Sequence, residues 1–132
     1  MGLQKMKYVI DSNIWIYAAA GNDIAINALN DIVKAELKAY SALTRLEIFR
    51  YKNLSSDEEC KLKSLFDCFE ELEISSDIID TAIEIRKLHN IKIPDAIIAA
   101  TAINYRAALI TRNVADFKNI THLNLLDPFF EK

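Results

Sequence analysis

Four acidic side chains of this sequence lie within or beside strongly apolar segments. Asp11 directly follows one apolar run, and Glu47 lies inside an apolar segment with helical spacing. Asp95 opens a second apolar helical segment, and Asp116 comes shortly after another apolar run. A charge in such surroundings is costly unless something compensates it, and crowded carboxylates persist because a cation neutralises them or because some stay protonated. Carboxylate oxygens suit hard divalent cations such as Mg²⁺, so metal-dependent chemistry is the first to consider.

Each of these carboxylates also has an ordinary structural interpretation, and most of the nineteen acidic residues in the chain must be ordinary surface groups. Asp11 can cap the helix that follows it, although Ser12 could do so equally well. Glu47 can pair with Arg50, three residues further on, and Asp95 is a favourable anion at a helix N-terminus. The last of the four can be a loop residue or a cap. Taken singly, none of them identifies a site.

The elements that must position these side chains alternate between short strands and helices. Short β-rich or apolar runs predict strands at Lys7–Ile10, Ala39–Ala42, Leu72–Ile74, Leu109–Thr111 and Leu123–Leu126. Helical spacing and capping residues predict helices over Asn13–Ala20, Ile24–Leu37, Leu43–Tyr51, Ser55–Phe69, Ser76–Leu88 and Pro94–Tyr105. The alternation predicts an α/β fold with a mostly parallel central sheet. Ligands of such sheets bind beyond the carboxyl ends of the strands, where we expect Asp11 and Asp116.

Four segments, taken together and in order, resemble one known protein family. They are Tyr8–Trp15 (YVIDSNIW), Ser41–Glu47 (SALTRLE), Pro94–Ala102 (PDAIIAATA) and Leu109–Phe117 (LITRNVADF). The sequence is similar to the PIN-domain nucleases, and within them to the VapC-like toxins of type II toxin–antitoxin systems. The order and spacing match along nearly the whole chain, and the third segment is the most specific. Asn113 stands where some members of the family carry Asp.

The resemblance implies a three-layer PIN-like α/β domain over residues 1–132, with a site built from the four acids. Asp11, Glu47 and Asp95 would be the main metal ligands, directly or through water. Asp116 would be a further ligand or would orient the attacking water. The implied cofactor is one or two Mg²⁺ or Mn²⁺ ions. The supporting side chains would be Ser12, Thr111 and Asn113.

The activity that the resemblance implies is hydrolysis of RNA phosphodiester bonds by a metal-activated water, which leaves 5′-phosphate and 3′-hydroxyl ends. The implied partners are the RNA substrate, a cognate antitoxin whose tail reaches the active site, and a second copy of the chain in a homodimer. Two alternatives remain open. One is a PIN-like domain that binds RNA or protein without cutting. The other is a phospho-acceptor receiver domain, which needs an acidic pair after the first strand, whereas only Asp11 follows it here.

The formal net charge of −3 is not that of a general nucleic-acid binder. Without the four negative charges of the candidate site it would be +1, so the rest of the chain is mildly basic. Several cations flank the motif segments and could meet phosphates, although for each of them a solvated surface charge is the better interpretation. They are Arg45, Arg50, Lys52, Arg112 and Lys118.

Length and composition indicate one globular domain. A chain of 132 residues, 52% of them apolar, can build a core without disulfide bonds. Cys60 and Cys68 lie eight residues apart in one predicted helix, which favours reduced thiols over a disulfide or a metal site. We find no apolar run of about 18 residues that could span a membrane, and Met1–Met6 lack the apolar stretch of a signal peptide. We therefore expect a cytoplasmic protein.

Overall fold

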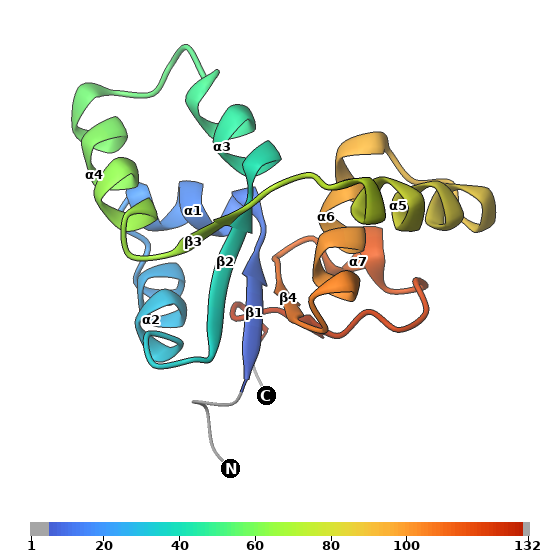
Figure 1. Cartoon of the computed structure of the whole chain (residues 1–132). Helices are drawn as coiled ribbons and strands as arrows, with labels where there is room; N and C mark the ends of the chain where they lie inside the picture. The colour runs from blue at the N-terminus through green and yellow to red at the C-terminus, as the bar shows by residue number, and fades with distance from the viewer. Residues whose placement is uncertain (1–5, 131–132) are drawn as a thin grey trace.

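The computed structural model describes residues 6–130, which form a parallel sheet between two layers of helices (Figure 1). The strands are β1 (Lys7–Ile10), β2 (Leu37–Ser41), β3 (Glu70–Leu72), β4 (Ala108–Ile110) and β5 (Leu125–Leu126). The helices are α1 (Ser12–Ala19), α2 (Asp23–Asp31), α3 (Ala42–Phe49), α4 (Ser56–Phe66), α5 (Ser76–Leu88), α6 (Ile93–Asn104) and α7 (Val114–Phe117). The predicted three-layer α/β architecture with a mostly parallel sheet is confirmed.

The five strands of the described residues follow the order β3-β2-β1-β4-β5, and every neighbouring pair is parallel. β1 is the central strand, where Val9 pairs with Ala39 of β2 and with Leu109 of β4. Successive side chains of a strand point to opposite faces of the sheet. Val9 therefore packs into one core, whereas Tyr8 and Ile10 pack into the other. The carboxyl end of β1 consequently lies in the middle of the sheet edge.

Each face of the sheet carries its own hydrophobic core. α1, α2 and α4 cover one face, and α5, α6 and α7 cover the other (Figure 1). The fully buried Trp15 of α1 lies at the centre of the first core. Its ring meets the rings of Phe66, Phe69 and Tyr40 edge-on, with centroids 4.6, 5.0 and 5.7 Å away. This aromatic cluster fixes α1, and with it the turn that follows β1, against α4 and β2.

The second helix is shorter than predicted. A helix over Ile24–Leu37 is wrong at its C-terminal end, because α2 ends at Asp31 and Leu37 begins β2. Leu37 pairs with Lys7 of β1. Val33, which completes the apparent helical stripe in the sequence, is 49% exposed. Sheet pairing overrides the local helical spacing in these last residues.

Two further elements differ from the prediction. β3 pairs through Glu70–Leu72 instead of Leu72–Ile74, because β2 ends opposite Leu72. Residues 114–117 form the short helix α7, which the sequence analysis treats as a loop. A single turn is too short to show helical periodicity. The other elements begin within two residues of their predicted positions.

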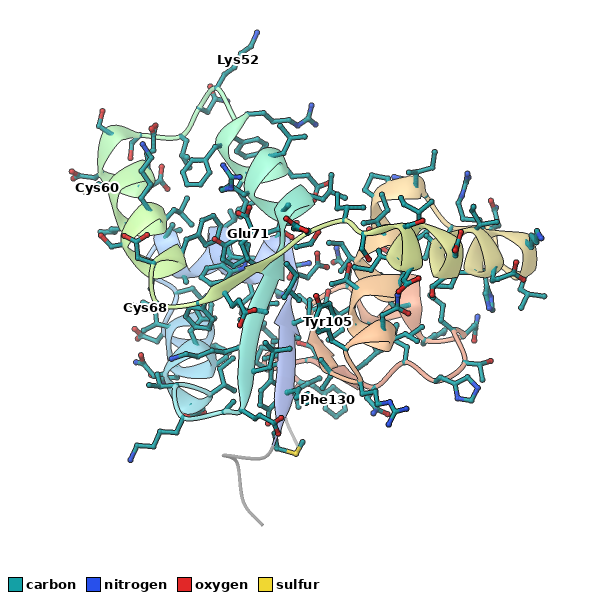
Figure 2. The ribbon with its side chains drawn as sticks, in the orientation of Figure 1. Lys52, Cys60, Cys68, Glu71, Tyr105 and Phe130 are labelled. Atoms are coloured by element: carbon teal, nitrogen blue, oxygen red, sulfur yellow. The ribbon has the colours of Figure 1, made fainter. Side chains whose placement is uncertain are left out.

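The start of α4 agrees with its sequence signal, since Ser55 and Glu58 form a complete capping box. α4 ends at Phe66 and not at Phe69, so Cys68 lies beyond it. Cys60 and Cys68 are exposed free thiols on the outer side of this part of the fold (Figure 2). In the part of the chain that the structure describes, no helix has the length and apolarity needed to cross a membrane. The first five residues, which were considered above for a signal peptide, lie outside the described residues.

Replacing Trp15 by Ala should lower the free energy of unfolding by about 3–5 kcal/mol, because it removes a fully buried aromatic side chain from a packed core. Trp15→Phe should cost less, since it keeps ring contacts and removes an indole N–H that has no hydrogen-bond partner among the described residues. Urea unfolding followed by circular dichroism would measure both. Leu88→Ala, an exposed position of α5, is the control and should change stability by no more than about 0.5 kcal/mol. A Trp15→Ala loss as small as that of the control would contradict the central role of Trp15.

Candidate active site

Asp11 lies at the carboxyl end of β1, with a side chain that is only 5% exposed. Its Oδ1 accepts a hydrogen bond of 2.8 Å from the backbone N–H of Ser12, so Asp11 is the N-cap of α1. Its Oδ2 accepts hydrogen bonds from the Thr111 hydroxyl at 2.9 Å and from Asn13 Nδ2 at 3.2 Å. Burial raises the pKa of Asp11, and these hydrogen bonds oppose the rise. The capping interpretation is therefore correct, and the same residue also lies at the sheet edge where ligands bind.

Asn13 and Thr111 connect the turn after β1 to the loop after β4. Asn13 Nδ2 also donates to the Thr111 hydroxyl oxygen at 3.3 Å, and Asn13 Oδ1 accepts from the backbone N–H of Arg112 at 3.1 Å. The sequence analysis does not single out Asn13, because an Asn in a first helical turn looks like an ordinary polar residue. Its only sequence signal is its place two residues after Asp11, inside the first motif segment.

The three predicted supporting residues all lie around Asp11 or the loop beyond β4. Thr111 is fully buried and bonds directly to Asp11, as a supporting role requires. Ser12 contributes its backbone N–H to the same carboxylate. Asn113 has an exposed side chain, and its backbone N–H donates to the Thr111 hydroxyl oxygen at 3.0 Å. Asn113 therefore contacts Thr111 through its backbone in this structure, and a role of its side chain stays a prediction.

Glu47 lies in α3, which begins directly after β2, and its side chain is partly buried. Burial raises the pKa of Glu47, and the negative charges of Asp11 and Asp95 raise it further. The nearby Arg50 guanidinium opposes this rise. The pKa of Glu47 thus responds to two acids of the candidate site and to Arg50, the partner expected for an ordinary surface carboxylate.

Asp95 lies in the first turn of α6, and Asp116 is an exposed residue of α7, just beyond β4. Burial raises the pKa of Asp95, and the negative charges of Asp11 and Asp116 add to this rise. The positive charge of Lys92 opposes it. The pKa of Asp95 therefore responds to two acidic neighbours, and the favourable helix N-terminus does not remove their effect.

At the carboxyl edge of the sheet, Asp95 lies within electrostatic reach of the three other predicted acids, and Glu47 is also within reach of Asp11. The four acids come from four separate segments, which begin after β1, β2 and β4 and at the start of α6. Within residues 6–130, no group of three or more carboxylate, thiol or imidazole side chains is arranged so that it could hold a metal ion. Mg²⁺ does not need such a set, because it usually binds through one or two carboxylates and keeps several waters.

Two cavities of the structure differ in whether the acids of the candidate site line them. A cavity of about 910 Å³ lies between α3 and α4, and its walls include Arg45, Phe49 and Glu71. Figure 2 labels Glu71, which lies on β3. None of the four acids lines this cavity. A second cavity, of about 420 Å³, is lined by Asp95 and Asp116. The smaller cavity is therefore the one that adjoins the candidate chemistry.

The sequence profile of the PIN domain matches residues 8–123, a span that contains all four acids. This chain belongs to the PIN domain family. PIN domains of the VapC type are generally nucleases, so the family supports a hydrolase. Membership of the family also separates the chain from the receiver domains considered above.

The solved structures that are similar to this PIN domain include chains of toxin–antitoxin complexes. A chain of a toxin–antitoxin complex from Klebsiella pneumoniae is 31% identical, with a TM-score of 0.78 over 93% of this chain and 98% of that chain. A chain of VapBC2 from Rickettsia felis, bound to a promoter DNA fragment, is 27% identical, with a TM-score of 0.79 over 92% and 98%. A chain of VapBC-1 from nontypeable Haemophilus influenzae is 25% identical, with a TM-score of 0.74 over 93% and 98%. A search among curated proteins finds no significant match. The resemblance to VapC-like proteins is confirmed.

The change in the free energy of unfolding caused by Glu47→Gln should be more favourable at pH 7 than at pH 4. A carboxyl whose pKa is raised by folding stabilises the folded state when protonated, and this contribution is lost as the pH rises through the raised pKa. At pH 7 the wild type therefore carries an unfavourable charge that the neutral amide lacks. Urea unfolding at both pH values, in EDTA, measures the difference. Asp80→Asn, an exposed position of α5, is the control, and an equal change at both pH values for Glu47→Gln would refute the prediction.

Proposed function

We propose that this PIN domain is a metal-dependent endoribonuclease and the toxin of a toxin–antitoxin pair. The observation that carries the proposal is the convergence of carboxylates from four separate segments on one sheet edge, where neighbouring negative charges raise the pKa of Glu47 and of Asp95. Such an arrangement is unfavourable by itself, and perturbed carboxylates in a cleft are typical of functional sites. The nuclease character of the family supports the same conclusion.

The side chains at this edge fit a hard divalent cation. The donors are carboxylate oxygens, which suit Mg²⁺ and Mn²⁺. Three of the four acids have raised pKa values because of burial, and in two of them neighbouring negative charges contribute. A cation would offset both costs. The chemistry that such an ion supplies when bound is activation of water and neutralisation of charge on phosphate oxygens.

The residues of the chain have distinct proposed roles. Asp11, Glu47 and Asp95 would hold one or two Mg²⁺ or Mn²⁺ ions, directly or through water. Asp116, which is exposed, would orient the attacking water or complete the ligand set. Thr111 fixes the rotamer of Asp11 through its hydrogen bond, so that one carboxylate oxygen keeps a defined direction. In-line attack of water on the phosphorus would leave a 5′-phosphate and a 3′-hydroxyl.

The proposed partners are a cognate antitoxin and a second copy of this chain. The antitoxin is supported by the toxin–antitoxin complexes among the similar structures. The homodimer is supported by apolar side chains on the outer surface of α5, where Ile79 is 41% and Ile83 is 48% exposed. These two residues lie one helical turn apart and so form one apolar stripe. Cellular RNA as the substrate agrees with the expected cytoplasmic location.

Cleavage of RNA by the purified chain is the direct test of the proposal. We expect cleavage in Mg²⁺ or Mn²⁺, none in EDTA, and 5′-phosphate ends on the products. Asp11→Asn and Asp95→Asn should each lower the rate by more than about a hundredfold, because loss of residues that only support metal ligands already costs 10- to 100-fold. Asp80→Asn is the matched control and should cut like the wild type. Cleavage that survives EDTA or both substitutions would overturn the proposal, and absence of cleavage would favour a PIN domain that only binds.

Added Mg²⁺ should stabilise the folded protein. At about 100 times its dissociation constant, a ligand of the native state alone raises the free energy of unfolding by about 2.7 kcal/mol. Thermal and urea unfolding with and without Mg²⁺ would measure this effect in wild type, Asp95→Asn and Asp80→Asn. We expect the gain in wild type and in Asp80→Asn, and a much smaller gain in Asp95→Asn. An equal gain in all three proteins would show that the ion binds elsewhere.

A further inference from the structure

The cavity of about 420 Å³ beside the candidate active site has the size of a small-ligand pocket, for which about 300–1,000 Å³ is usual. Asp95 and Asp116 form part of its lining. Its other walls come from the connector between α5 and α6 and from the turn after α7. Anything bound in this cavity would therefore lie directly next to two of the proposed metal-binding carboxylates.

The lining combines apolar surface with a half-exposed aromatic ring. Ile91 and Ile120 line the cavity and are themselves buried, so they offer it a small apolar surface. His89 lines it with a partly buried imidazole. Unpaired nucleic-acid bases bind to proteins by stacking on such rings and on apolar side chains. The cavity can thus receive the flat face of a base.

Polar groups with both donors and acceptors complete the walls. Asn90 and Asn119 each present an exposed amide, which offers N–H donors and a carbonyl acceptor. Such amides match the mixed donors and acceptors on the edges of bases. Lys92 adds an ammonium group, which suits a phosphate oxygen. Together these groups match a nucleotide better than a purely anionic or purely apolar ligand.

Hydrogen bonds hold both walls in place. Arg86 Nε donates to the carbonyl of Ile91 at 3.0 Å, and the backbone N–H of His89 donates to the carbonyl of Ile85 at 2.9 Å. On the opposite wall, the backbone N–H of Ile120 donates to the carbonyl of the buried Phe117 at 3.0 Å. A preformed pocket loses little entropy when a ligand binds, so it can select among ligands.

We propose that this cavity binds one unpaired nucleotide of a single-stranded RNA, next to the phosphate that is cut. The base lies on the apolar surface with its edge read by Asn90 and Asn119, and Lys92 contacts a neighbouring phosphate. This inference rests on the proposed ribonuclease function and names the residues that select the nucleotide beside the cut. A base inside a duplex cannot enter, because its edge is paired and its faces are stacked.

Binding of short RNAs to the full chain tests the inference without cleavage. Fluorescence anisotropy in Ca²⁺, with intact RNA verified on gels, would compare single-stranded hexamers of each base with a duplex of the same length. We expect single strands to bind at least about tenfold more tightly than the duplex, with a preference for one base. Asn90→Ala and Asn119→Ala should each lower affinity for the preferred hexamer about tenfold and reduce the preference. Lys92→Gln should weaken all hexamers to a similar degree and reduce the salt dependence.

Matched controls lie far from the cavity, on α4 and in the loop before it, on the other side of the sheet (Figure 1). Lys61→Gln and Asn53→Ala, both at exposed positions, should leave RNA binding unchanged. Stabilisation by Mg²⁺ should persist in all the cavity variants, which would show that the carboxylates are undisturbed. If the chain cuts RNA but the cavity variants match these controls, or if duplex binds as well as single strands, the inference fails and the proposed function stands. If the variants lose single-strand binding but the chain cuts nothing, the nucleotide site stands and the proposed function fails.

Discussion

The buried carboxylate of Asp11 is the constraint on which the candidate site depends. A desolvated carboxylate is stable only when its oxygens accept hydrogen bonds or meet a cation. Here the donors come from both the turn after β1 and the loop after β4, through Ser12, Asn13 and Thr111. They coincide because Ile10 pairs with Ile110, so the next residues of the two strands are side by side. A slip of one residue in this register would separate Asp11 from Thr111 and turn alternate side chains to the wrong face.

Parallel topology and close helix packing bring the other acids to the same place. Strands that all run in one direction end at one edge, so the segments after β1, β2 and β4 meet there. Asp95 is not on a segment that follows a strand, because it lies on α6, in the helix layer that covers one face of the sheet. The side of α6 that faces the sheet carries buried small residues, and small side chains allow a helix to lie close to its neighbours. The two hydrophobic cores then hold the carboxylates together against their mutual repulsion.

Sequence analysis could predict the order of the elements because they leave local signals, whereas the choice of the four acids rests on the family resemblance and stays a prediction. The capping box at Ser55 and the apolar runs of the strands are read directly from neighbouring residues. The end of α2 could not be read in this way, since Leu37 fits a helical stripe locally and only its pairing with β1 makes it a strand residue. Asn13 was missed for a similar reason. Its importance arises from bonds to Thr111 and Arg112, residues nearly one hundred positions away.

Several of the cations that flank the motif segments contact other side chains of the fold, which limits their ability to bind a phosphate backbone. The guanidinium of Arg112 lies 4.3 Å from the ring centre of Phe129 and 4.9 Å from that of Tyr17, so it fastens the C-terminal segment to α1. Arg45 donates from Nη2 to Glu71 Oε2 at 3.0 Å and is likewise engaged within the fold. The cations that act on the candidate site are Arg50 and Lys92, and each faces a carboxylate. In the proposed nuclease, divalent cations at the carboxylates would therefore add to the attraction of RNA by the remaining exposed cations, which include Lys52 and Lys118.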